Sequence, residues 1–205
     1  MYRLYSIPGS CSTGIHALLN KLGQDVEIVD RASVPDYAEL VPTNQVPALV
    51  AGDELLTEGA AIVLHLLETH AALPRSPNDL RQFRQWLLFD YATLHATYSK
   101  LFMAGTADLV ADPESRQALI DHVADRISTL WRIVEVRLAS RNWIVGDAPT
   151  VIDYLMAIYV NWGNAVPEAR IEIEPRTRGL VARVVALTEF RRALEREGIE
   201  HRMPA

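Results

Sequence analysis

The 205-residue sequence predicts two parts, an N-terminal α/β layer over residues 1–70 and an all-helical bundle over residues 80–205. In the first part, short apolar runs typical of strands alternate with segments of helical periodicity. Residues 71–79 contain two prolines, a serine and an asparagine, a composition typical of a linker. Beyond the linker, large apolar side chains recur at spacings of three and four residues, which indicates long amphipathic helices.

The first elements place the chain's one cysteine at the start of a helix. Tyr2–Tyr5 reads as a strand, which a Pro-Gly pair then ends. Ser12 is the expected N-cap of a helix over Thr13–Leu22, which a glycine closes. Cys11 therefore lies at a helix N-terminus, where aligned peptide dipoles favour an anion. We expect the pKa of its thiol to lie below the usual value of ~8.5, with thiolate as the result.

A hairpin follows a conspicuous proline. Val46 and Pro47 precede the apolar run Ala48–Val50, and a proline at a strand entry is expected at a sheet edge or in a cis peptide. Ala51–Asp53 reads as a turn, with Glu54–Leu56 as the return strand.

The first turn of the next predicted helix is suited to binding charged groups. Thr57, Glu58 and Gly59 open a helix that we expect to run to about His70. Its free N–H groups are suited to a carboxylate, and Glu58 is suited to an ammonium group. An amine and a carboxylate on one carbon, with a thiol some distance away, describe glutathione.

The second part has two predicted helical features besides its long first helix. A helix is expected from Pro113, a residue favoured at the first helical position, to about Ala139. Thr150 followed three residues later by Asp153 matches a capping pattern, and the apolar run Tyr154–Val160 after it predicts a buried helix. We interpret Asp153 as a folding device and not as a catalytic base.

Composition excludes several function classes. The formal net charge of −6 argues against nucleic acid as a partner, because phosphate binding needs a basic face. No uncharged apolar run reaches ~18 residues, so no membrane span is expected, and no signal peptide is evident. One cysteine permits no internal disulfide, which is typical of a reducing cytoplasm. The histidines show no ligand spacing, so no metal site is expected.

The ordered motifs identify a family resemblance that covers nearly the whole chain. The sequence resembles the soluble glutathione S-transferases, and most closely their bacterial beta class. This resemblance implies a thioredoxin-like first domain, a helical second domain, a homodimer, and conjugation of glutathione to small apolar electrophiles. The residues that carry it are Pro8–Ser12, Gln45–Leu49, Leu56–Gly59, Leu94-His95, Trp143–Gly146, Thr150–Leu155 and Ala193–Gly198.

The resemblance also implies site residues. Cys11 would lie beside the glutathione sulfur, with hydroxyl groups of Ser10 and Ser12 and the ring of His95 nearby. Plain alternatives stay open: a buried structural cysteine, a simple helix cap, and a structural histidine. Glutathione would contact Cys11, Val46, Pro47, Glu58, Gly59 and Arg31. Candidates for the wall of the electrophile pocket are Ile7, Tyr98, Phe102, Met103 and Trp162. These side chains could equally be ordinary core residues.

Departures from the beta-class pattern leave other functions open. Ala96 and Leu88 replace a basic residue and an asparagine, and Arg31 is the one cation in a shortened segment before Gln45. Each lost contact costs ~1–3 kcal/mol, so glutathione affinity is expected to be about ten- to a hundredfold weaker than typical. The alternatives are glutathione-dependent thiol-disulfide exchange through Cys11 and a non-catalytic binding or regulatory module. Without a second cysteine at a Cys-x-x-Cys spacing, a dithiol oxidoreductase is disfavoured.

Overall fold

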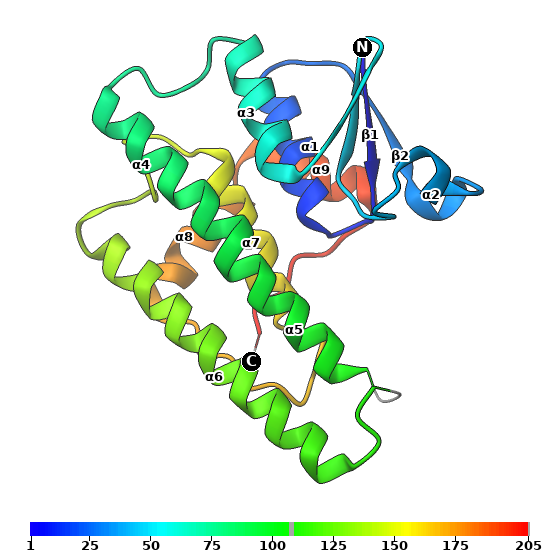
Figure 1. Cartoon of the computed structure of the whole chain (residues 1–205). Helices are drawn as coiled ribbons and strands as arrows, with labels where there is room; N and C mark the ends of the chain where they lie inside the picture. The colour runs from blue at the N-terminus through cyan, green and yellow to red at the C-terminus, as the bar shows by residue number, and fades with distance from the viewer. Residues whose placement is uncertain (107–108, 205) are drawn as a thin grey trace.

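The computed structural model describes residues 1–106 and 109–204. Its first part is a four-stranded sheet with three α-helices and a short 3₁₀ turn (Figure 1). The elements are β1 (Tyr2–Ser6), α1 (Cys11–Lys21), β2 (Val26–Asp30), η1 (Arg31–Ser33), α2 (Tyr37–Leu40), β3 (Ala48–Ala51), β4 (Glu54–Thr57) and α3 (Gly59–Thr69).

The strand order in the sheet is β2-β1-β3-β4. Strands β1 and β2 are parallel, whereas β3 is antiparallel to both β1 and β4, and Leu4 pairs with Ile28 on one side and Leu49 on the other. Helices α1 and α3 cover one face, and α2 lies on the opposite side of the sheet (Figure 1). On that second side, Tyr37 of α2 packs against Tyr5 with ring centroids 5.5 Å apart. The Val46-Pro47 peptide is cis, and β3 is an inner strand, so the cis alternative holds and the edge alternative is wrong.

The second part is helical throughout its regular elements. These are α4 (Pro77–Leu88), the π-helical η2 (Phe89–His95), α5 (Ala96–Gly105), α6 (Pro113–Arg137), the 3₁₀ turn η3 (Leu138–Ser140), α7 (Val151–Trp162), α8 (Pro175–Val185) and α9 (Thr188–Glu197). The predicted fold class, a thioredoxin-like layer followed by a helical bundle, is confirmed. In the part of the chain described, no helix is long and apolar enough to cross a membrane.

Two features of the helices differ from those expected. Helix α1 begins at Cys11 and its N-cap is Ser10, whose hydroxyl oxygen accepts a hydrogen bond from the Ser12 N–H at 3.3 Å. Ser12 is therefore inside the first turn and is not the cap. The periodic run after Leu80 is also not one regular helix, because the π-helical segment η2 joins α4 to α5. A wider helical turn changes which side chains share a face, and apolar periodicity alone does not reveal it.

The capping pattern before α7 is present as predicted. The Asp153 carboxylate accepts hydrogen bonds from the Thr150 N–H at 2.7 Å and from the Ile144 N–H at 2.9 Å. Burial raises the pKa of Asp153 to about 6, partly offset by these same hydrogen bonds. Helix α7 is buried from Val151 to Val160, as its apolar sequence indicates.

One apolar core runs through both parts of the chain. Helix α1 packs on α3 and also on α7 and α9, so residues of the α/β layer and of the bundle belong to a single buried cluster. In Figure 1, α9 lies beside α1, although the two are far apart in sequence. Dividing the chain into domains over residues 1–70 and 80–205, with 71–79 as linker, stays our proposal.

Candidate functional site

Cys11 occupies the first position of α1 but is almost completely enclosed. Its exposed fraction is 4%, and its sulfur lies 4.0 Å from the carbonyl oxygen of Val46. Burial raises the pKa of the thiol to about 12, which outweighs the lowering by the N–H groups of Cys11 and Ser12. The expectation of a depressed pKa is therefore wrong for the unliganded protein. A helix N-terminus stabilises an anion, but the loss of hydration at this depth is the larger effect.

Cys11 lines a cavity of about 350 Å³ between the α/β layer and the bundle. Six of the predicted site residues meet here from α1, α3, η2 and the connections before β3 and α3: Cys11, Val46, Pro47, Glu58, Gly59 and His95. The cavity is completed by Thr43, Gln45, Thr57, Tyr91, Ala96 and Ser99.

The first turn of α3 presents an uncapped helix end to this cavity. Glu58 stands at the N-cap position, yet its side chain makes no capping hydrogen bond, and no acidic residue lies in the first turn. Its φ of 65° is a left-handed conformation that is unfavourable for a residue with a Cβ atom. The Glu58 side chain is exposed at the cavity edge, so its carboxylate is available to a cation. The free N–H groups behind it favour an anion.

His95 closes the cavity from the helical side. Burial lowers the pKa of its imidazole, so the ring is neutral at pH 7. It packs against Trp162 and Tyr159 with ring centroids 5.2 and 5.8 Å apart. A neutral imidazole in this position can donate or accept one hydrogen bond but supplies no charge.

The two predicted serines, Ser10 and Ser12, hydrogen-bond within the loop and the first turn of α1. Neither lines the Cys11 cavity. The Ser12 hydroxyl is fully buried and hydrogen-bonds to the hydroxyls of Ser6, at 2.9 Å, and of Ser10. Ser10 instead faces a neighbouring cavity. The predicted contact of these hydroxyls with a thiolate is thus not preformed.

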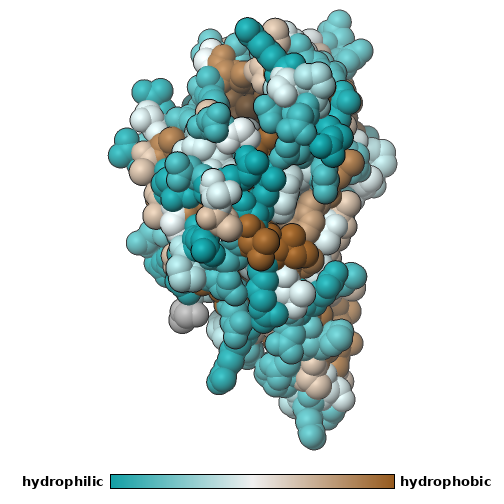
Figure 2. All heavy atoms as spheres, turned by 90° about the vertical axis from the view of Figure 1, so that its left-hand side faces the viewer, coloured by the Kyte–Doolittle hydropathy of each residue, from teal (hydrophilic) through white to brown (hydrophobic). Residues whose placement is uncertain are grey.

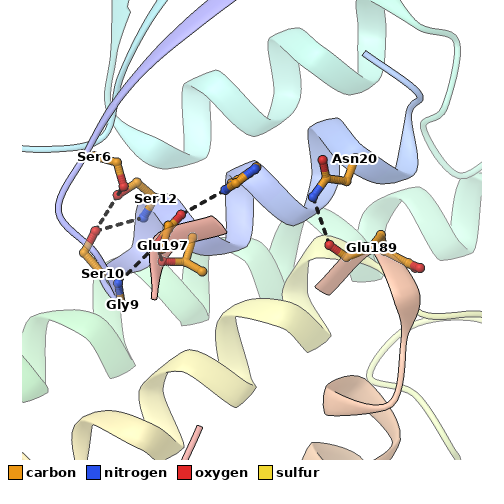
Figure 3. Close-up of polar contacts among 9 residues, drawn as sticks. Ser6, Gly9, Ser10, Ser12, Asn20, Glu189 and Glu197 are labelled. Carbon is orange, nitrogen blue, oxygen red and sulfur yellow. Dashed lines mark hydrogen bonds and ion pairs between the residues drawn. The ribbon is translucent and has the colours of Figure 1, made fainter. Parts of the chain in front are cut away.

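Glu197, at the end of α9, makes hydrogen bonds that hold this loop in place (Figure 3). Its carboxylate accepts hydrogen bonds from the Thr13 hydroxyl at 2.6 Å, the His16 ring at 3.0 Å and the Gly9 N–H at 3.2 Å. The side chains of His16 and Glu197 are each 2% exposed. These contacts fix the start of α1, and with it the position of Cys11.

Arg31, which the resemblance implies as a glutathione contact, lies outside the Cys11 cavity. It lines a separate groove on the far side of the loop, where its Nε donates to the Asn44 side chain at 3.3 Å. Its guanidinium also lies 5.6 Å from the centre of the Tyr37 ring. Arg31 is thus close in sequence to Gln45 and Val46 but does not line the cavity that they line.

Three of the five residues predicted for the electrophile wall line one cavity, and the other two do not. Ile7, Phe102 and Trp162 line a second cavity of about 910 Å³, together with Ser10 and the C-terminal segment after α9. Tyr98 is fully buried, and its hydroxyl oxygen accepts a hydrogen bond from Trp131 Nε1 at 3.0 Å, so it belongs to the core. Met103 is 62% exposed and lies outside the cavity. Helical periodicity identified the helix but not which face turns to the cavity.

Tyr91 also lines the cavity, although it was not among the predicted site residues. A Cβ atom built on Gly59 would lie 2.3 Å from Tyr91 Cε1, so the ring occupies the place of a side chain at position 59. The close approach of the Tyr91 ring therefore requires glycine at position 59. Within residues 1–106 and 109–204, no cluster of three or more potential metal ligands occurs.

Comparisons with known proteins agree with this architecture. The model for the N-terminal domain of glutathione S-transferases matches residues 1–68. Glutathione S-transferase GST-4.5 of Xanthomonas campestris is 30% identical over 208 residues, covering 96% of this chain and 99% of the relative. The chain belongs to the glutathione S-transferase family. The predicted membership of a family of transferases is thereby confirmed.

Solved structures support the assignment. The glutathione S-transferase of Xylella fastidiosa is 26% identical, has a TM-score of 0.86, and is covered completely by 98% of this chain. A sphingomonad glutathione S-transferase solved in complex with glutathione has a TM-score of 0.78 at 24% identity, covering 97% of this chain and 100% of its own, and supports the fold alone.

Proposed function

We propose that this protein binds glutathione in the Cys11 cavity and activates its thiol for conjugation to small apolar electrophiles. The observation that carries the proposal is the meeting of Cys11, the cis proline and the uncapped end of α3 with Glu58 in one cavity. The family to which the chain belongs favours the same activity.

In this proposal, the two charges of the γ-glutamyl group bind at α3. The substrate ammonium pairs with the Glu58 carboxylate, and its carboxylate accepts hydrogen bonds from N–H groups of the first turn. The backbone of Val46, next to Pro47, contacts the cysteinyl unit. The glutathione sulfur then points toward Cys11 at the start of α1.

The raised pKa of Cys11 assigns it a different role from the one that the sequence suggested. A thiol that stays protonated donates its S–H to the glutathione sulfur and so stabilises the glutathione thiolate. Each unit by which the glutathione pKa falls corresponds to about 1.4 kcal/mol. The dipole of α1 adds to this stabilisation, and the neutral ring of His95 offers a further hydrogen bond.

The electrophile is assigned to the second cavity, with Ile7, Phe102 and Trp162 as its apolar wall. The Trp162 indole donates to the Gly9 carbonyl at 2.8 Å, which ties this wall to the loop before Cys11. An apolar molecule there would lie next to the attacking sulfur. Proximity and exclusion of water then favour the conjugation step.

We also assign the chain to the beta class, and infer a cytoplasmic homodimer of about twice the 22.9 kDa chain mass. The face that carries α4 and α6 is mainly hydrophilic, with compact hydrophobic patches (Figure 2). Leu88, Ile133 and Val136 are among the exposed apolar side chains on these helices. Light scattering at micromolar concentration tests this assembly, and a monomer mass would contradict it.

The second candidate is thiol-disulfide exchange with glutathione, which is favoured by the presence of Cys11 itself in the cavity. Retention on immobilised glutathione first separates both enzymes from a non-catalytic module. Conjugation of an aryl halide, measured beside reduction of a mixed disulfide, then identifies the dominant reaction. Aryl halide turnover that is absent despite glutathione binding would refute the conjugation proposal.

A further inference from the structure

The hydroxyl group of Tyr91 is a polar group that the proposed conjugation does not yet use. Its oxygen is buried and has no hydrogen-bond partner among the residues that the structure describes. Buried polar atoms are almost always hydrogen-bonded, so an unpartnered hydroxyl on a residue that lines a ligand cavity needs an explanation. Burial raises the pKa of this hydroxyl well above its usual value, so at neutral pH the group is an uncharged donor.

The Tyr91 side chain reaches the cavity from the helical part of the chain. Tyr91 lies in η2 and lines the Cys11 cavity, as Glu58 and Gly59 do. A Cβ atom built on Gly59 would lie 2.3 Å from Tyr91 Cε1 and 2.5 Å from the Tyr91 hydroxyl oxygen. Both distances are far below the ~3.5–4.0 Å of a normal contact between heavy atoms. The hydroxyl therefore occupies the place that a side chain at position 59 would take.

This place lies at the N-terminal end of α3, because Gly59 is the first residue of that helix. The Glu58 side chain makes no capping hydrogen bond there, and the first turn contains no acidic residue. The N–H groups of the first turn therefore favour an anion, and the Tyr91 hydroxyl adds a donor at the same end of the helix. A carboxylate fits this arrangement, since its two oxygens can accept hydrogen bonds from the backbone and from the hydroxyl at once.

We propose that Tyr91 is a glutathione-binding residue whose hydroxyl donates a hydrogen bond to the γ-glutamyl carboxylate at the first turn of α3. This inference rests on the proposed function and extends it, because a residue of the helical part then takes part in recognising the carboxylate. The Tyr91 ring already lines the cavity and rests against a glycine, so a small rotation of the side chain brings the hydroxyl to the ligand. Glu58 pairs with the ammonium on the same carbon, so the two residues recognise the two charges separately.

Three peptides separate the two charges of the γ-glutamyl group in a binding experiment. Glutathione carries both charges, γ-aminobutyryl-cysteinyl-glycine lacks the carboxylate, and glutaryl-cysteinyl-glycine lacks the ammonium. Titration calorimetry measures the dissociation constant of each peptide for the wild type, for Tyr91→Phe and for Glu58→Ala. Tyr91→Phe keeps the ring beside Gly59 and removes only the unpartnered hydroxyl.

The effect of Tyr91→Phe should depend on whether the peptide carries the carboxylate. A hydrogen bond to a charged group is lost with glutathione and with the glutaryl peptide, so both should bind roughly tenfold more weakly or worse. The aminobutyryl peptide offers no carboxylate, so its affinity should change by less than about twofold. Glu58→Ala should give the complementary pattern, with a loss for glutathione and the aminobutyryl peptide but not for the glutaryl peptide.

Tyr159→Phe is the matched control. The Tyr159 hydroxyl is also buried and unpartnered in the described part of the chain, yet Tyr159 does not line the cavity. This variant should bind all three peptides as the wild type does. For Tyr91→Phe, no loss, or an equal loss with all three peptides, overturns the inference, while glutathione binding by the wild type leaves the proposed function standing. A wild type that binds none of the peptides overturns both.

A second test uses glutathione alone and returns a hydroxyl to the same place from α3. Tyr91→Ala removes the ring that occupies the position of a side chain on residue 59, and Gly59→Ser in the same protein then fits there. The double variant should bind glutathione about tenfold more tightly than Tyr91→Ala does. A double variant that binds no better than Tyr91→Ala contradicts the inference.

Thermal unfolding separates binding from a structural role of the hydroxyl. Because the Tyr91 hydroxyl has no partner in the described unliganded chain, Tyr91→Phe leaves no acceptor unsatisfied and should keep the wild-type thermal midpoint. A midpoint that falls together with the affinity for all three peptides would make the hydroxyl structural and overturn the inference.

Discussion

Replacing Glu197 by alanine tests whether α9 holds the loop before α1 and the first turns of α1 in place. The substitution leaves the Thr13 hydroxyl, the His16 ring and the Gly9 N–H without their acceptor in a region where His16 is almost fully buried. Each buried group that loses its partner costs ~1–3 kcal/mol. Since these effects overlap, we expect a loss of about 3–5 kcal/mol in the free energy of unfolding.

For a chain of this length, 1 kcal/mol shifts the thermal midpoint by about 2–4 °C, so Tm should fall by about 6–20 °C. Differential scanning calorimetry measures this shift. The matched control is Glu195→Ala, an exposed position on the same helix, for which the midpoint should change little. A decrease for Glu197→Ala no larger than that of the control would refute the assignment of Glu197 as the residue that fixes the loop.

The remaining predictions concern binding, catalysis and pH. Glu58→Ala should weaken glutathione binding in titration calorimetry more than Cys11→Ala does, because it leaves the substrate ammonium unpaired; the reverse order would contradict the proposed pose. Cys11→Ala should retain measurable aryl halide conjugation, since the α1 dipole and His95 persist, and complete loss with intact glutathione binding would make Cys11 essential. The raised pKa of Asp153, about 6, means that the native state holds a proton which the unfolded chain releases near pH 4. Its contribution to stability should therefore fall by up to about 3 kcal/mol as pH rises from 4 to 7, as urea midpoints of wild type and Asp153→Asn would show; a constant difference would contradict it.

The fold was predictable because local signals and global arrangement agree. The apolar run at Ala48, the Gly-Asp turn and the capping pair Thr150 and Asp153 each have a direct local cause, and each element appears where the sequence places it. Several site residues could be predicted for the same reason, since Cys11 and Glu58 stand at helix starts that their neighbours define.

The other predictions failed because the sequence does not show how deeply a side chain is buried or in which direction it points. Sequence proximity to a helix N-terminus indicates the dipole at Cys11 but not the loss of hydration, which dominates its pKa. Periodicity places Tyr98 and Met103 on one helix without showing that one faces the core and the other faces solvent. The burial of Asp90 in the π-helical segment η2 could not be predicted either, because a carboxylate is rarely buried in a helix.

The single core that includes α1 has a consequence for how the protein loses its structure. Helix α1 lies between the sheet on one side and helices α7 and α9 on the other, so neither part can open without exposing apolar surface of the other. Denaturation should therefore proceed in one transition, with the sheet and the bundle melting together. A fragment of residues 1–70 would leave one side of α1 bare and should not persist as a folded unit. The thiol-bearing helix is thus also the element on which the cooperativity of the whole chain depends.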